Sequence, residues 1–530
     1  MSGSTDDRQF ATIGATARGS GPRTPGERRP RHRRTTRRLE VDDVLVVKRS
    51  KIRTAISGTA VGNFMEWFDF GIYGYLAVTM TAVFTTGFDE NVGLLIVLLG
   101  FAVSFLVRPF GGMVLGPLGD KIGRQKVLFV TMAMMAVATG LIGMLPTSAA
   151  IGGWAIVLLY FLKMVQGFST GGEYAGASTY VAEFSPDKSR GFWSSFLDVG
   201  SYLGFAAGAS VVAITTFVSE SIAGPTAMVD GAWRIPFLLA IPLGAVAIWF
   251  RLRIPETPAY ADAEQSGETV HNADDPLARQ GLRGIVRLYW RPLLIAVALV
   301  AATNTVSYAL TSYMPAYLET EVGVSNVMAA VATVPVLILL ACMLPFIGRL
   351  SDKIGRKPLY WCAVISTLVL TLPAFAIMQT GLIWAVLLAL VMLAVPLAFY
   401  AAIAASTLPA MFPTASRFGA MGLAYNVSVS LFGGTTPLIS EALIQLTGNS
   451  YMPAFYVMFF AVVASIALLS MKESARRPLL GSMPTVETQA EAVALVEGQD
   501  SDPLIDTSTM PLQVVGAGAP ASTDDAKPGV

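Results

Sequence analysis

The chain has 530 residues, of which 53% are hydrophobic and only 14% are charged, whereas about 25% of the residues in an average soluble domain are charged. Its two cysteines, Cys342 and Cys362, lie in apolar runs and its two histidines in polar segments, so neither a disulfide framework nor a metal centre is predicted. A net charge of +1 gives no indication of a nucleic-acid partner. Long apolar runs favour membrane-spanning α-helices over the alternating strands of a barrel.

Residues 1–50 are polar and include the basic run RRPRHRRTTRR. We expect a disordered tail here, because the segment has little apolar surface to bury. Next to a membrane, such a run attracts anionic lipids by about 1 kcal/mol per cation. The segment is too polar for a signal peptide.

Twelve stretches approach the length of about 20 apolar residues that a membrane span needs, which predicts an all-α integral membrane protein. An N-terminal bundle at 51–252 contains spans near 54–82, 92–115, 127–146, 151–181, 192–218 and 233–252. A polar loop follows at 253–290. A C-terminal bundle at 291–472 contains spans near 292–318, 325–348, 359–378, 382–410, 419–446 and 452–471. Residues 473–530 show no sustained heptad and are expected to form a disordered tail.

The loops between these spans alternate in charge. One set carries DKIGRQK, SPDKSRG, RLSDKIGRK and TASR, whereas the other set contains neither Lys nor Arg. Because short cationic loops stay on the cytoplasmic side, the pattern predicts that both termini and the central loop are cytoplasmic. The expected location is the inner (cytoplasmic) membrane, in a multi-pass arrangement.

Two carboxylates interrupt the first span. Glu66 and Asp69 lie about 12 to 15 residues into it, or roughly 18 to 22 Å at 1.5 Å per residue. Helical spacing places Asn63 and Tyr73 on the same polar stripe. An ionisable group at this depth costs at least about 2.5 kcal/mol and is functional by default. We expect this pair to bind and release protons, and the sequence does not distinguish which member does so.

Lys163 lies at a similar depth in the fourth span and is the expected counter-charge of these acids. It fits a permanent salt bridge, or a ligand for a substrate carboxylate once the acids are protonated. Glu173 is a further predicted proton-coupling group, although it and Asp198 fit helix packing equally well. Arg108, in the second span, is expected to reach the interface or to pair with Asp120 or the fourth span.

The second half offers polar and aromatic groups in place of buried charges. Aromatic faces attract quaternary ammonium groups by about 2 kcal/mol when desolvated. Tyrosines also gather at membrane interfaces, which accounts for Tyr317 and Tyr313 but not for deeper residues. The predicted substrate-binding residues from both halves are therefore Asn63, Trp67, Tyr73, Lys163, Asn304, Tyr308, Tyr400 and Asn426.

An internal repeat relates the two halves. GPLGDKIGRQK at 116–126 recurs as GRLSDKIGRKP at 348–358, each time between the second and third spans of its half. Positive-inside topology alone would explain the basic residues, but duplication at matched positions favours a charge network that latches the cytoplasmic face. The predicted gate residues are Gly116, Asp120, Gly123, Arg124, Asp352, Gly355 and Arg356.

These repeated loops resemble the signature of the major facilitator superfamily. GNFMEWFDFGIYG, VRPFGG, KMVQGFSTGGEYAGA and STLPAMFPT resemble its metabolite:proton symporter branch, and most closely its osmoregulatory proline/betaine symporters, the ProP group. The likeness covers roughly residues 50–478. It implies alternating access and proton-driven uptake of zwitterionic solutes such as proline, glycine betaine or ectoine, with no cofactor. Some osmosensing relatives carry a C-terminal coiled coil, which this chain lacks.

Buried charge also bears on the substrate class. A di- or tricarboxylate calls for two or more buried cations, and the sequence places only Lys163 at mid-depth. This favours a zwitterion or monocarboxylate. Symport of an organic acid such as 2-oxoglutarate or shikimate is the alternative within transport. A membrane-bound enzyme or sensor is disfavoured, because no nucleophile-base pair, metal cluster or phosphate loop is present.

Overall fold

The computed structural model describes residues 38–122, 124–251, 276–502, 504–507 and 510. The first half contains α1 (Arg49–Tyr75), α2 (Ala77–Phe84), α3 (Glu90–Ile122), α4 (Arg124–Met144), α5 (Ser148–Ile151), α6 (Trp154–Ser169), α7 (Glu173–Phe184), α8 (Arg190–Ala223), η2 (Met228–Ala232) and α9 (Arg234–Arg251).

The second half contains α11 (Pro276–Tyr308), η3 (Ala309–Tyr313), α12 (Met314–Thr320), α13 (Asn326–Ile354), α14 (Arg356–Met378), α15 (Ile383–Thr407), η4 (Pro409–Met411), α16 (Thr414–Ser428), η5 (Val429–Gly433), α17 (Thr436–Thr447) and α18 (Met452–Ser470). Outside the bundles lie η1 (Val41–Asp43), β1 (Leu45–Val46), β2 (Thr485–Val486) and α19 (Gln489–Gly498).

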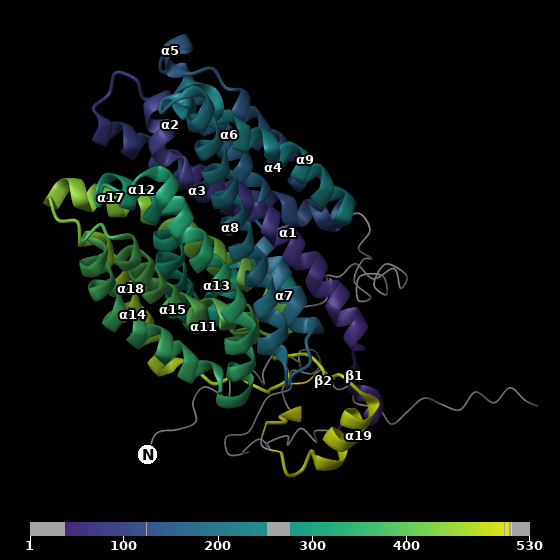
Figure 1. The fold of residues 1–530 in the computed structure, drawn as a ribbon. Coiled ribbons are helices and arrows are strands. Elements are labelled where there is room, and N and C mark those ends of the chain that lie inside the picture. The colour runs from purple at the N-terminus through teal and green to yellow at the C-terminus, as the bar shows by residue number, and fades with distance from the viewer. Residues whose placement is uncertain (1–37, 123, 252–275, 503, 508–509, 511–530) are drawn as a thin grey trace, which may run out of the picture.

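The two halves form two helical bundles packed against each other (Figure 1). β1, β2 and α19 lie at one end of the bundles, which we call the terminal face; α2 and α5 lie at the other end, the distal face (Figure 1). Within the described residues, ten helical stretches are long and apolar enough to cross a membrane. α1 and α4 take the places of the first and third predicted spans.

Four of the predicted spans are interrupted helices. The first breaks at Leu76 and the fourth at residues 170–172, whereas the seventh and eleventh pass through the π-helical turns η3 and η5. Such turns occur frequently at functional sites, and transporters build their binding sites from discontinuous helices. The interruptions therefore direct attention to the region where these four helices meet.

α1 and α8 pack with their backbones in close contact. Gly200, Gly204 and Gly208 recur every fourth residue on α8, and a Cβ on any of them would meet main-chain atoms of α1. Small residues at this spacing let transmembrane helices approach closely. The helix that carries Glu66 and Asp69 is thus tightly packed against α8.

Residues 38–47 and 476–502 form a small domain at the terminal face. β1 pairs in parallel with β2, and Val44, Val486 and Ala492 form a separate apolar cluster. The expected disordered tails, residues 1–50 and 473–530, differ from the structure at residues 38–50 and 473–502. These segments are ordered because β1 pairs with β2, and no heptad pattern predicts such a pairing. All of the basic run expected to attract anionic lipids except its last residue, Arg38, lies outside the described residues. Arg38 forms an exposed ion pair with Asp500.

The C-terminal segment also crosses from one half to the other. Its residue Thr485 accepts a hydrogen bond from the Asp187 amide at 2.9 Å, and its residue Leu480 accepts one from the Thr414 amide at 3.0 Å. Asp187 precedes α8 in the first half, and Thr414 begins α16 in the second half. Burial raises the pKa of Asp187, although Arg190 beside it acts in the opposite direction.

α11 begins earlier than the predicted seventh span. The central loop was expected to extend to residue 290, but the helix starts at Pro276. Ile285, Leu288 and Tyr289 recur at helical spacing and pack against the hydrophobic core. Charged residues alternate with these apolar ones, so the segment 276–290 does not look like a membrane span in the sequence.

Candidate functional site

Glu66 of α1 forms a buried ion pair with Arg108 of α3. Its Oε1 lies 2.9 Å from Arg108 Nη2, and the two side chains are 2% and 1% exposed. The guanidinium carbon lies 4.3 Å from the ring centroid of Phe105 and 4.9 Å from that of Phe70. Because so little water reaches the pair, separating the two charges requires a compensating event, such as protonation of Glu66.

The position of Arg108 corrects the prediction that it reaches the interface. α3 extends to Ile122, so Arg108 lies about 14 residues, or roughly 21 Å, from the end of its helix. Close packing of α3 against α6 holds it there, because a Cβ at Gly111 or Gly167 would collide with main-chain atoms of the facing helix. The sequence signal that could have found this pairing is a lone Arg within a long apolar span.

Asp69 belongs to a hydrogen-bonded chain that joins three helices. The Thr139 hydroxyl of α4 donates to Asp69 Oδ2 at 2.7 Å, and Gln166 Nε2 of α6 donates to Thr139 Oγ1 at 2.6 Å. Lys163 Nζ then donates to Gln166 Oε1 at 2.8 Å. Asp69 Oδ1 is buried and has no hydrogen-bond partner among the described residues. This series of hydrogen bonds therefore links the carboxyl group of Asp69 to the amine of Lys163, and Asp69 Oδ1 remains available as an acceptor.

Lys163 is not the direct counter-charge that the sequence predicted for both acids. Among the described residues, Arg108 takes that place beside Glu66, and Lys163 reaches Asp69 only through Gln166 and Thr139. Its ammonium lies 4.3 Å from the ring centroid of Tyr73, whose hydroxyl donates to the Val97 carbonyl at 2.7 Å. Arg108 and Lys163 are thus two buried cations near these acids, each beside aromatic rings, whereas the sequence predicted only Lys163 at mid-depth.

A small cavity of about 30 Å³ lies between the two halves. This volume holds only one or two water molecules. Its aromatic lining comes from both halves: Trp67, Tyr174, Tyr202, Phe205, Tyr360 and Tyr425. Asn304, Ser307, Thr303 and Ser201 add polar groups, and Asp198 is the only charged residue among the described lining residues.

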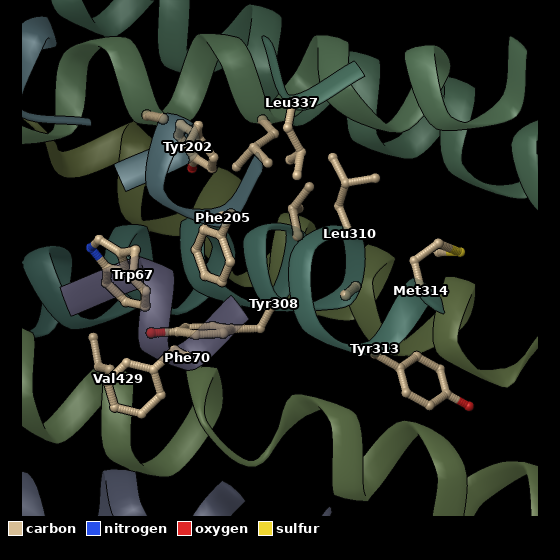
Figure 2. Packing of buried hydrophobic residues seen from close by; sticks show 14 of the residues in the cluster. Trp67, Phe70, Tyr202, Phe205, Tyr308, Leu310, Tyr313, Met314, Leu337 and Val429 are labelled. Atoms are coloured by element: carbon tan, nitrogen blue, oxygen red, sulfur yellow. The ribbon is translucent and has the colours of Figure 1, made fainter. Parts of the chain in front are cut away.

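Trp67 stands between this cavity and the ion pair. It lines the cavity, and its ring centroid lies 5.5 Å from the guanidinium carbon of Arg108. The ring centroids of Phe205 and Tyr308 lie 5.2 Å and 5.8 Å from the ring centroid of Trp67. Figure 2 shows these three rings packed together. Neither Glu66 nor Asp69 lines the cavity in this conformation, so the carboxyl groups lie behind an aromatic wall.

Of the eight predicted substrate-binding residues, Trp67 and Asn304 line the cavity. Asn63 joins α1 to α8 by donating to the Leu197 carbonyl at 3.0 Å and by bonding Ser201. Tyr308 packs on Trp67, and Asn426 donates to the Gly171 carbonyl at 3.3 Å. The others lie elsewhere: Tyr73 and Lys163 near Asp69, and Tyr400 against Tyr360.

Asp198 and Tyr174 are cavity residues that the sequence left without a firm role. Tyr174 donates to Asp198 Oδ2 at 3.0 Å, and its ring stacks on Tyr425 of the second half with a centroid distance of 4.2 Å. Glu173, the neighbour of Tyr174, begins α7 and accepts a hydrogen bond from Thr131 at 2.8 Å. The stacked tyrosines place the Asp198 carboxylate at the contact between the halves.

The second copy of the repeated loop joins the two halves at the terminal face. Asp352 at the end of α13 accepts hydrogen bonds from the amides of Gly191 and Phe192 at 2.8 and 2.9 Å, which places a carboxylate at the N-terminus of α8 in the other half. Arg356 donates to the same carboxylate at 2.7 Å. Gly355 between them has a φ of 108°, which favours glycine.

The first copy of the loop is only partly described. Gly123 lies outside the described residues, as do the side-chain surroundings of Gly116, Asp120 and Arg124. Nearby, Arg417 of α16 forms an ion pair with Glu183 of α7 at 2.6 Å, which also joins the halves. At the distal face, Gln445 of α17 donates to the Asn91 carbonyl of α3 at 3.1 Å. Contacts between the halves therefore lie on both sides of the cavity.

Comparison with known proteins agrees with this architecture. The pattern of the sugar (and other) transporter family matches residues 55–482. The chain belongs to this family. It is 64% identical to the ectoine/proline transporter ProP of Corynebacterium glutamicum over 476 residues, which are 89% of this chain and 94% of the relative. It is 41% identical to the proline/betaine transporter of Escherichia coli K12 over 473 residues, or 88% and 93% of the two chains.

Solved structures show the same fold at low sequence identity. The proton:xylose symporter XylE bound to 6-bromo-6-deoxy-D-glucose is similar with a TM-score of 0.62 at 17% identity, over 81% of this chain and 98% of that one. A partially occluded inward-open structure of XylE from Escherichia coli gives a TM-score of 0.60. The predicted major facilitator fold, and with it a multi-pass membrane transporter that is not an enzyme, is confirmed.

Proposed function

We propose that this protein imports zwitterionic compatible solutes, such as ectoine, proline or glycine betaine, by proton symport through alternating access. The observation that carries the substrate class is the cavity wall between the halves. Six aromatic rings and one carboxylate surround it, and no Lys or Arg is among its described lining residues. Such a wall suits an ammonium group, by cation-π attraction and by charge.

The composition of this wall disfavours the organic-acid alternative. A dicarboxylate such as 2-oxoglutarate would meet Asp198 without a cation lining the cavity. A zwitterion can place its ammonium group near Asp198 and the tyrosines. Its carboxylate can then accept hydrogen bonds from neutral donors such as Asn304 and Ser307. The likeness to transporters named for ectoine, proline and betaine supports the same class.

Proton coupling is assigned to the carboxyl groups behind Trp67. Glu66 and Asp69 are buried in the helix packed most closely on α8, and each contacts a group on another helix of the first half. Protonation of Glu66 would release Arg108 from its ion pair and leave a cation without a partner. We assign to that event the repacking of the aromatic wall that opens the cavity.

The orientation follows from the charge of the terminal face. Lys188 lies in the loop before α8, and Lys353 and Arg356 lie at the adjoining ends of α13 and α14. Short cationic connections remain cytoplasmic. Both termini are accordingly placed in the cytoplasm, with uptake directed toward the terminal face.

Uptake into proteoliposomes tests the proposal. Labelled glycine betaine, proline and ectoine are presented with and without an inward proton gradient, at normal and raised osmolality, beside labelled 2-oxoglutarate and shikimate. We expect gradient-driven accumulation of at least one zwitterion and none of either acid. Accumulation of 2-oxoglutarate or shikimate alone would establish the organic-acid alternative instead.

Variants then test the coupling. In Glu66→Gln and Asp69→Asn we expect loss of gradient-driven accumulation while solute exchange without a gradient persists, because exchange needs no net proton movement. Glu441→Gln is the matched control, since Glu441 is also buried and accepts a hydrogen bond from Tyr313 at 2.9 Å in the second half. Undiminished accumulation in both first-half variants would remove them from the coupling mechanism.

A further inference from the structure

A second cavity, of about 350 Å³, lies on the terminal face where the halves and the C-terminal segment meet. Five cationic side chains line it, against two acidic ones. The cations come from three parts of the chain: Arg49 and Lys188 from the first half, Arg349 and Lys353 from the second half, and Arg476 from the C-terminal segment.

The two acids of this cavity are already engaged. Asp352 accepts the hydrogen bonds from the start of α8 and from Arg356. Glu487 accepts from the Ser189 hydroxyl at 3.3 Å and from Trp193 Nε1 at 3.5 Å. Both carboxylates are therefore occupied by other hydrogen-bond donors: the start of α8 and Arg356 for Asp352, and Ser189 and Trp193 for Glu487.

The cations, in contrast, lack acidic partners. Arg49, Lys188, Arg349 and Lys353 form no ion pair with any residue that the structure describes. All four are exposed. Gathering like charges around one cavity is unfavourable unless an anion compensates them.

The backbone conformation of Arg476 is a second feature of this cavity. It has a φ of 58° and is the only residue other than glycine with positive φ in the described part of the chain. This conformation is unfavourable for a residue with a Cβ. The backbone nonetheless adopts it, and Arg476 Nε donates to the Asp352 carbonyl at 2.5 Å, which holds the guanidinium at the cavity wall.

We propose that this cavity binds a phosphate-bearing anion, supplied either by the headgroup of an anionic phospholipid or by a soluble phosphate ester. Arginine and lysine clusters recognise phosphate through charge-assisted hydrogen bonds. At about 30 Å³ per water molecule, the volume corresponds to roughly ten waters, enough for a phosphate group with part of its ester. Trp193 and Phe192 supply an apolar side to the same wall.

The bound anion acts on transport because its ligands belong to both halves. It contacts all of them only while the terminal face is closed. A ligand that favours one of two conformations shifts the population toward it. Anion binding therefore stabilises the conformation in which Asp352 caps α8, and it does so whichever solute the central cavity accepts.

Thermal unfolding of the full-length protein in detergent tests this site. The probes are short-chain phosphatidylglycerol, short-chain phosphatidylcholine and glycerol 3-phosphate, each titrated separately. We expect phosphatidylglycerol to raise the unfolding midpoint in a saturable manner, because a ligand that binds the folded state stabilises it. A similar rise with glycerol 3-phosphate identifies a soluble phosphate as sufficient, whereas a rise with phosphatidylglycerol alone identifies the lipid.

A pair of matched variants localises the effect. Arg349→Gln with Lys353→Gln removes two cavity cations, and Arg287→Gln with Lys472→Gln removes two exposed cations elsewhere. We expect the half-saturating concentration to rise about 25-fold in the first pair, or about fivefold per cation, and less than twofold in the second. The proposal is wrong if neither phosphate probe shifts the midpoint, if phosphatidylcholine acts equally, or if both pairs change alike.

Discussion

The ion pair between Glu66 and Arg108 can be tested with a double-mutant cycle. Both side chains are at most 2% exposed, and removing one partner of a buried pair costs about 3–5 kcal/mol. Each half of the protein is a bundle of the size for which 1 kcal/mol shifts the unfolding midpoint by about 2–4 °C. We therefore expect Glu66→Gln to lower the midpoint by about 6–20 °C.

The two single variants should differ in a defined order. A guanidinium stays charged at every accessible pH, so Glu66→Gln leaves a permanent buried cation. In Arg108→Met, Glu66 can instead become neutral by binding a proton, and the cost is smaller. The double variant leaves no buried charge at this point and should recover most of the loss.

Thermal unfolding of the purified variants in detergent measures the cycle. The control is Glu441→Gln, whose carboxylate accepts from the neutral Tyr313 hydroxyl and should lose only about 0.5–1.5 kcal/mol. If the loss in the double variant equals the sum of the two single losses within about 0.5 kcal/mol, Glu66 and Arg108 are not coupled and the reasoning fails.

Three further predictions concern the terminal face and helix packing. A cysteine placed in the cavity by Leu408→Cys, in a cysteine-free background, reports on access from the solvent through its labelling by a water-soluble maleimide. Asp352→Asn should speed this labelling, because two amides at the start of α8 lose a charged acceptor. An unchanged rate would contradict the proposal that Asp352 latches the terminal face. Burial opposes ionisation of Glu473, but four backbone hydrogen bonds outweigh it and lower its pKa below the usual 4.5, so its stabilising effect is complete above about pH 5 and disappears as the pH falls through the lowered value. The midpoint difference between wild type and Glu473→Gln should shrink on that descent, and a constant difference would exclude the carboxylate as the cause. Gly204→Ala should lower the unfolding midpoint by several degrees because its Cβ would meet the backbone of α1, whereas Gly422→Ala, with open space around it, should not; equal shifts would contradict the packing argument.

The features that the sequence predicted well are those that depend on a single helix, such as the positions of the spans. The depth of Glu66 and Asp69 follows from counting residues along α1, and the apolar runs give the remaining spans to within a few residues for most of them. The repeated loop drew attention to Asp352 and Gly355, because a duplicated motif is visible without any knowledge of contacts; the structure shows Asp352 in contact with the start of α8, and the gate role stays a prediction.

Pairings between helices were beyond such reasoning. Nothing in the sequence distinguishes Arg108 from Lys163 as the partner of Glu66, because the choice depends on how α3 and α6 approach α1. The stacking of Tyr174 on Tyr425 likewise joins residues 251 positions apart. Tyr73 and Asn63 lie on the predicted stripe of α1, yet both make helix-helix contacts and neither lines the cavity.

The C-terminal segment that crosses the terminal face has a mechanical consequence. Asp187 fastens it to one half through Thr485, and Thr414 fastens it to the other through Leu480. Only four residues lie between Leu480 and Thr485, so this part of the chain has little spare length. If the halves separate at this end during transport, as proposed, one of these two hydrogen bonds is expected to break, which adds to the barrier of each cycle. The length of the segment between Leu480 and Thr485, and the strength of its two hydrogen bonds, would thus affect the turnover rate from a region remote from the solute.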